Sequence, residues 1–277
     1  MNMTEGPVLG KMIRFTIPVM ASGILQLLFN AADVAVVGKF AGEAAMAAVG
    51  SCGALINLIV NLFIGLAVGA GVIAAQELGA RRYEEVDKLI STALTSSIIG
   101  GIAVMIFGIF MAEPLLRLMD TPEDVLAEAV PYMRAYFCGM PGCLVYNYMA
   151  AILRSSGDTK RPLFFLTAAG VVNVILNLIF VIVFHMSVAG VALATIISQA
   201  SSWLFGLAYI NRAYPDYAIR LFCFRFDREL FREIMRIGLP IAFQSVLFSI
   251  SNIVVTAALN TFPPHVVNAK TIAFNIE

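Results

Sequence analysis

The sequence predicts an all-α, polytopic membrane protein, with a six-helix amino-terminal lobe followed by the first helix or so of a second, parallel lobe. Of its 277 residues, 60% are hydrophobic and only 13% are charged, whereas a soluble domain carries about twice that charged fraction. The apolar residues also gather in long segments, and a helix of about 20 such residues crosses a bilayer. We therefore expect the lipid bilayer to be a partner of this chain.

The hydropathy pattern predicts seven membrane-spanning helices. They cover about 14–38, 48–76, 91–112, 131–153, 162–184, 188–210 and 235–259, and an eighth apolar segment begins near Val266.

The first helix carries a polar stripe and the one acidic residue that lies within an apolar span. Pro18, Ser22, Gln26 and Asn30 follow one another at steps of four, and Asp33 comes three residues later. This spacing places all five on one helix face. An ionisable group inside a membrane is costly and indicates a functional site. Asp33 is therefore the first candidate functional residue.

The second helix combines polar and small residues. Asn57 and Asn61 lie four residues apart and are followed by Gly65, Gly69 and Gly71. Glycines in a membrane helix allow a neighbouring backbone to approach closely. We expect this helix to pack tightly against another.

Two departures from regular helix are predicted around the fourth span. Residues 113–129 are expected to include a short surface helix outside the membrane, with Thr121 as its cap. Pro141 and Gly142 lie near the middle of the span, where a missing backbone donor and a missing side chain permit a bend.

The fifth and sixth helices continue the polar pattern. Asn173 and Asn177 share one face of the fifth, and Thr195, Gln199 and Ser202 share one face of the sixth. Such stripes either form hydrogen bonds between helices or line an aqueous cavity. Because nearly every span has one, a cavity-lining role is also plausible for several of them.

A basic connector divides the chain into residues 1–211, 212–232 and 233–277. Its arginines alternate with aromatic residues, which could suggest nucleic-acid stacking, but a cytoplasmic membrane loop has the same composition. We expect no nucleic-acid partner. With two histidines and four cysteines in no CxxC pair, the sequence also suggests no metal cluster and no cofactor.

An internal repeat relates the first helix to the seventh. A shift of 222 residues aligns Arg14 with Arg236 and Pro18 with Pro240. Since six spans separate the copies, both cross the membrane in the same direction, as in transporters built from parallel repeats. Two periods of this length predict a complete protein of about 440 to 460 residues and twelve helices.

The basic residues predict the orientation. Fourteen of the eighteen fall on the side of the amino terminus or in alternate loops, and only Lys39, Arg117, Arg134 and Lys270 fall on the other side. By the positive-inside rule the amino terminus is cytoplasmic. We expect a multi-pass protein of the plasma or inner membrane, with no cleaved signal peptide.

Several segments together resemble the multidrug and toxic compound extrusion (MATE) family of secondary antiporters. They are Pro18 with Gln26 and Asp33, then residues 65–80, 153–162 (LRSSGDTKRP), 173–180, 238–242 and 271–277. The resemblance implies a monomeric transporter of twelve helices, in which two lobes surround a central cavity. It would export cationic or amphipathic small molecules in exchange for H⁺ or Na⁺.

Two positions depart from the family pattern. Many relatives carry an acid and a following proline where this chain has Asn177 and Leu178, and another branch carries Glu at the position of Phe248. The resemblance therefore assigns ion coupling, with a possible Na⁺ site, to Asp33 and its candidate neighbours Gln26, Asn30, Asn173 and Asn177. It suggests a substrate cavity lined by Asn57, Asn61, Asn147, Gln199 and Asn252. Its candidate hinges are Pro18, Pro141 and Pro240.

Three alternatives are weaker. A flippase for a lipid-linked sugar would share the two-lobed architecture but would need cationic groups in mid-membrane to hold a pyrophosphate. A channel or membrane scaffold would not depend on an ion gradient. A membrane-embedded enzyme would need clustered acids or a nucleophile with a base, and no such cluster is visible in the sequence.

Overall fold

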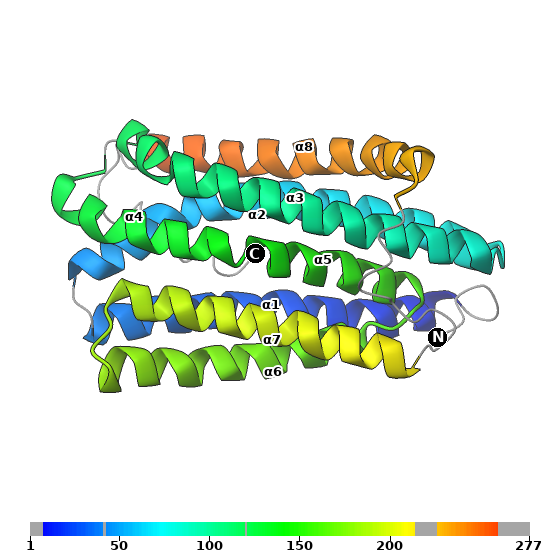
Figure 1. Ribbon diagram of the computed structural model, residues 1–277, viewed down its shortest axis with the longest axis horizontal. Helices are drawn as coiled ribbons and strands as arrows, with labels where there is room; N and C mark the ends of the chain where they lie inside the picture. Colours follow the sequence, from blue (N-terminus) through cyan, green and yellow to red (C-terminus); the bar gives the residue numbers. More distant parts are fainter. Residues whose placement is uncertain (1–7, 41–42, 120, 214–225, 260–277) are drawn as a thin grey trace.

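The computed structural model describes residues 8–40, 43–119, 121–213 and 226–259, and a few side chains within these ranges, including that of Asn252, lie outside the described part. Every regular element in the described ranges is helical. The elements are α1 (Val8–Phe40), α2 (Glu43–Gly79), α3 (Tyr83–Leu118), α4 (Glu123–Cys138), α5 (Met140–Ser155), α6 (Lys160–Leu178), the π-turn Ile179–Val183, α7 (Val188–Ala213) and α8 (Arg228–Leu259). They form an elongated bundle (Figure 1).

The expected set of membrane spans is confirmed over the described residues. Six helices are long and apolar enough to cross a membrane, and α4 with α5, bent by 48° at their junction, makes a seventh. The eighth segment, near Val266, lies outside the described residues.

The bend between α4 and α5 lies where the sequence predicts it. Gly139 separates the two helices and Pro141 stands in the first turn of α5. Proline has no backbone N–H, so it cannot donate to the carbonyl of Phe137 four residues earlier. The helix therefore breaks at Gly139, where the backbone N–H turns instead to the carbonyl of Tyr136 at 3.0 Å.

The predicted short surface helix within residues 113–129 is wrong. Residues up to Leu118 extend α3, and those from Glu123 onward begin α4 directly. The cap position of α4 is Pro122, which makes no side-chain cap bond, rather than Thr121. Arg117 joins the two helix ends through ion pairs with Glu113 at 3.2 Å and Glu123 at 2.7 Å, so no separate helix is needed there.

The chain turns that the basic residues mark lie together at one end of the bundle. In Figure 1 the start of α1, the α2–α3 and α5–α6 turns, the end of α7 and the start of α8 are all at the right-hand end. The end of α1, the end of α3 and the π-turn are at the opposite end. This sorting agrees with the sequence, while the side of the membrane on which the basic end lies stays a prediction.

Helix α2 is the central element. It packs against α3, α4 and α5 on one side and most extensively against α8 on the other. A Cβ on Gly69 would lie 2.7 Å from the backbone nitrogen of Gly238, and one on Gly65 would lie 2.5 Å from Cα of Ala242. The expected close approach at these glycines is therefore confirmed, and the partner is α8.

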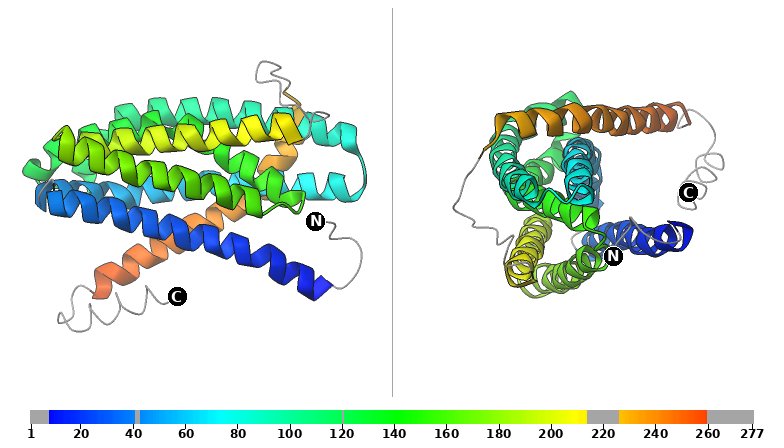
Figure 2. Two further views of the ribbon diagram at one scale, coloured as in Figure 1. Left: turned by 90° about the horizontal axis from the view of Figure 1, so that it is seen from below. Right: turned by 90° about the vertical axis from the view of Figure 1, so that its right-hand side faces the viewer.

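Helices α6 and α7 form a pair that holds α1. The ring of Phe29 on α1 lies directly over Gly170 of α6, where a Cβ would be 1.9 Å from the ring. Figure 2 shows α1 and α8 extending from the same side of the bundle. They begin at the same end (Figure 1), as the repeat predicts.

Candidate functional site

The carboxylate of Asp33 is held between α1 and α6. The side-chain amide of Asn177 donates a hydrogen bond to Oδ1 of Asp33 at 2.5 Å. Asn177 is fully buried, whereas Asp33 is half-buried. The acid is thus fixed from one side by a buried partner and remains partly open on the other.

The contact continues through two more side chains, on α6 and α7, to a backbone carbonyl. The amide nitrogen of Asn177 also donates to Oδ1 of Asn173 at 3.1 Å. The amide of Asn173 donates to the hydroxyl of Thr195 at 3.4 Å, and that hydroxyl donates to the carbonyl of Val191 at 2.9 Å. Asp33 is therefore the first member of a chain of polar groups that runs away from α1.

In this series of hydrogen-bonded side chains, the amide oxygen of Asn177 is the amide atom that makes no hydrogen bond. It is buried and has no hydrogen-bond partner among the described residues. An amide has two donors on nitrogen and an acceptor on oxygen, and the two ends exchange places when the group rotates by 180°. Asn177 can therefore donate to an ionised Asp33 or, after rotation, accept from a protonated one.

The same oxygens suit a hard cation. Carboxylate, amide and hydroxyl oxygens are the ligands that hard ions prefer, and Asp33, Asn173, Asn177 and Thr195 supply them. The buried, unpartnered oxygen of Asn177 can serve as a ligand of such an ion, just as it can accept a hydrogen bond from a protonated Asp33. Over the described ranges, no group of three or more His, Cys, Asp or Glu residues could hold a metal ion.

Three of the five predicted coupling residues are brought together, namely Asp33, Asn173 and Asn177. Gln26 and Asn30 share the helix with Asp33 but are exposed, because α6 covers α1 on one side only. Thr195 is an addition to the site. Its place in the polar stripe of the sixth span was visible in the sequence, but its pairing with Asn173 depends on how α6 packs on α7.

Two tyrosines of α4 also lie near this acid. Tyr132 and Tyr136 are close enough to Asp33 to interact with its charge, and their rings lie 6.2 Å apart. Nothing in the sequence distinguishes these two residues, because tyrosines are common in membrane helices.

The residues predicted to line a substrate cavity are more scattered. Asn57 is exposed and Asn61 is half-buried, while Asn147 donates to the carbonyl of Cys143 in its own helix at 2.9 Å. Gln199 is bonded to Tyr136. The side chain of Asn252 lies outside the described residues. A shared cavity for this set stays a prediction.

The three predicted hinge prolines have different surroundings. Pro18 is buried in α1, and its carbonyl accepts a bond of 2.8 Å from the hydroxyl of Ser22. Pro141 follows the 48° bend. Pro240 is exposed on α8, between the two residues that meet α2. A hinge role is therefore supported by a visible break only at Pro141.

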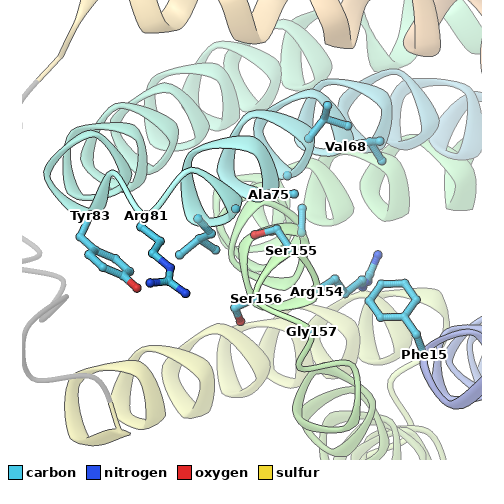
Figure 3. Close-up of a pocket in the computed structure, with 14 residues that line it drawn as sticks. Phe15, Val68, Ala75, Arg81, Tyr83, Arg154, Ser155, Ser156 and Gly157 are labelled. Carbon is cyan, nitrogen blue, oxygen red and sulfur yellow. The ribbon is translucent and has the colours of Figure 1, made fainter. Parts of the chain in front are cut away.

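A cavity of about 880 Å³ opens at the basic end of the bundle, between α1, α2 and α5. Figure 3 shows Arg81 and Tyr83 on one side of it and Arg154 and Phe15 on the other. Of the predicted cavity residues whose side chains are described, namely Asn57, Asn61, Asn147 and Gln199, none lines it.

Comparison with known proteins shows which family the chain resembles and which proteins are similar to it. The family model MatE matches residues 18–179. The chain is 30% identical to the probable multidrug resistance protein YpnP of Bacillus subtilis over 96% of this chain and 60% of that protein. It is 29% identical to the probable multidrug resistance protein YoeA of the same organism, over 90% of this chain and 55% of that protein.

A solved structure has the same arrangement of helices. It is a crystal structure of a MATE protein in a bent conformation, with 28% identity and a TM-score of 0.88 over 96% of this chain and 60% of that one. The chain thus spans about 60% of the length of the proteins it matches.

Proposed function

Because this chain belongs to the MATE family of transporters, we propose that the complete protein exports cationic or amphipathic small molecules in exchange for H⁺ or Na⁺. Family membership supports transport rather than catalysis. The names of the curated relatives concern multidrug resistance, which supports a broad range of xenobiotic substrates. The orientation proposed for this activity has the amino terminus in the cytoplasm of a plasma or inner membrane, and the protein is proposed to act as a monomer.

One observation carries the proposal for coupling, namely the hydrogen bond between Asp33 and the buried Asn177 at 2.5 Å. The carboxylate of Asp33 lies within a span, is partly open on one side, and is bonded on the other to an amide that can rotate by 180°. Such a carboxylate can exist in two states. In one state it is ionised and accepts from Asn177, and in the other it holds a proton or a cation. Exchange between the states would change the contact between α1 and α6.

Alternating access supplies the rest of the mechanism. With the outer side open, Asp33 takes up H⁺ or Na⁺ and substrate leaves. With the inner side open, the ion leaves and substrate enters. The ion gradient then drives export because the protein changes state only when one of the two ligands occupies it.

The test is transport by Asp33→Asn in proteoliposomes that contain the complete protein. The amide keeps the size of the side chain but cannot exchange a proton, so accumulation of a fluorescent lipophilic cation under an imposed pH or Na⁺ gradient should fall to the level of protein-free vesicles. Separate pH and Na⁺ gradients identify the ion. Undiminished transport by this variant at equal protein content would exclude Asp33 as the coupling residue.

Asp87→Asn is the matched control, because it removes the same charge from an exposed residue near the basic end of α3. It should transport as the unmodified protein does. The same vesicles also separate the alternatives, since a channel would show no saturation with substrate and no dependence on the ion gradient. A lipid-linked sugar flippase would move lipid rather than the soluble cation.

A further inference from the structure

From the cavity at the basic end of the bundle, we propose that this protein binds the phosphate head group of an anionic phospholipid between α1, α2 and α5. The proposal concerns a second site, apart from the polar chain around Asp33. It does not depend on the transport reaction.

The charge of the cavity favours an anion. Two arginines, Arg81 and Arg154, are among the described residues that line it, and no acidic residue is among them. Over the described residues neither arginine has a carboxylate within ion-pair distance. By contrast, Arg82 and Arg161 beside them are paired with Glu77 and Asp158.

Arg154 is the stronger evidence for a bound anion, because it is half-buried whereas Arg81 is exposed. A guanidinium removed from water needs a counter-charge, and the last turn of α5 offers only the partial charge of helix carbonyls. A phosphate oxygen would supply the missing charge, and the planar fork of arginine suits phosphate geometry.

Arg81 is fixed by the backbone. Its φ of 61° is in the left-handed region, which non-glycine residues seldom adopt and which is found at functional positions more often than elsewhere. This conformation ends α2 and turns the chain toward α3. The side chain of Arg81 stands on the side of the cavity opposite Arg154 (Figure 3).

The two serines between the arginines are less available as donors. The hydroxyl of Ser155 donates to the carbonyl of Ile152 at 2.6 Å, and that of Ser156 donates to the carbonyl of Leu153 at 2.8 Å. The guanidinium groups are therefore the principal donors to an anion in this cavity.

The shape of the cavity favours a lipid over a soluble anion. Its lining on α2 extends from Gly79 at the helix end to Val68, a distance of about 16 Å at 1.5 Å per residue. The lining at the deep end, including Val68 and Val72, is apolar, and Phe15 of α1 closes one side. The cavity is thus charged at the membrane surface and apolar toward the membrane interior, as a phospholipid is. Basic pockets between membrane helices on the cytoplasmic side are suited to anionic lipid head groups.

Native mass spectrometry of the complete protein tests this, with phosphatidylglycerol and phosphatidylcholine of identical acyl chains as probes. We expect the unmodified protein to retain phosphatidylglycerol in preference. Arg81→Gln with Arg154→Gln should weaken phosphatidylglycerol binding about twenty-five-fold, since each cation near a lipid surface contributes a factor of about five. Arg81→Gln alone, an exposed change that leaves the packing intact, should weaken it about fivefold.

The matched control is Arg212→Gln with Arg232→Gln, two exposed arginines at the same end that do not line the cavity. It should bind phosphatidylglycerol normally. Equal affinity for the two lipids, or an equal loss in the control, would overturn the proposal.

Two further arms distinguish a lipid from a soluble phosphate. Excess inorganic phosphate or glycerol 3-phosphate should fail to displace phosphatidylglycerol, because neither fills the apolar part of the cavity. Val68→Asn should weaken lipid binding without affecting any binding of the soluble anions. Displacement by glycerol 3-phosphate, together with normal lipid binding by Val68→Asn, would show that the site takes a soluble anion instead.

Discussion

Oδ1 of Asp33 accepts a hydrogen bond of 2.5 Å from the side-chain amide of Asn177, a residue 144 positions further along the chain. The bond joins the first helix to the sixth, and through Asn173 and Thr195 it reaches the seventh. The bond therefore pairs the one acid of the first span with an amide that is fully buried on the sixth helix.

We predict that Asp33 and Asn177 are energetically coupled. In a double-mutant cycle, Asp33→Ala and Asn177→Ala should give an interaction free energy of about 0.6 kcal/mol, and at most about 1.7 kcal/mol, which are the average and the maximum for hydrogen bonds within membranes. The measurement is thermal unfolding of the purified protein in detergent. Asp33→Ala with Asn57→Ala is the comparison, since Asn57 is exposed on α2, and the two changes should be additive. If the effects of Asp33→Ala and Asn177→Ala were additive, the hydrogen bond between them would not contribute to the free energy of unfolding.

The contact between α2 and α8 should be sensitive to a single methyl group. Gly69→Ala would place Cβ within 2.7 to 2.8 Å of backbone atoms of Gly238 and Ile234, and overpacking of this kind costs about 1–3 kcal/mol. Gly53→Ala is the same change in the same helix, but its Cβ would have nothing within 4 Å. It should be neutral or stabilising by up to about 1 kcal/mol. Similar melting temperatures for the two variants would contradict the close approach.

Pro141 should maintain the bend between α4 and α5. Pro141→Ala supplies an N–H for the carbonyl of Phe137, so the two helices should become straighter than the present 48°. Spin labels at residues 128 and 152 should then move apart, as measured by pulsed electron paramagnetic resonance. Pro131→Ala, in the middle of α4 where the helix continues without a break, should leave the distance unchanged.

The basic end of the bundle should face the cytoplasm. In a protein whose native cysteines are replaced by serine, Ser156→Cys in the α5–α6 turn should resist an impermeant maleimide added to intact cells. Thr121→Cys, in the turn between α3 and α4 at the opposite end, should react. The reverse pattern would invert the orientation.

The sequence was sufficient for most of the fold because each span is a long apolar run with its own hydrogen bonds. It located the bend at Pro141 and the close approach at Gly65 and Gly69, since both depend on properties of single residues. It failed between residues 113 and 129, where turn-forming Pro122 suggested a separate helix. Ion pairs of Arg117 with Glu113 and Glu123 join α3 to α4 there instead.

The candidate site was predicted less fully than the fold. Asp33 was identifiable because an acid in a span is conspicuous, and the shared face of Asn173 and Asn177 follows from helical periodicity. The separation of Asp33 from Gln26 and Asn30 was not predictable, because it depends on which part of α1 is covered by α6. In the sequence Arg154 is one of the fourteen basic residues on the side of the amino terminus, and only the structure shows that it lines a cavity together with Arg81 and Phe15.

The seam between α2 and α8 has a consequence for synthesis of the protein at the ribosome. Gly65 and Gly69 meet backbone atoms of residues near 238 and 242, so this surface of α2 has no partner until about 170 further residues have been translated. Helices α1 to α7 can pair with one another as they are synthesised, but the glycine surface of α2 can pair only after α8 has been made. At about 5–20 residues per second, α2 would spend roughly ten to thirty seconds with its glycine surface unpaired, and that interval is when the insertion machinery or a chaperone would have to protect it.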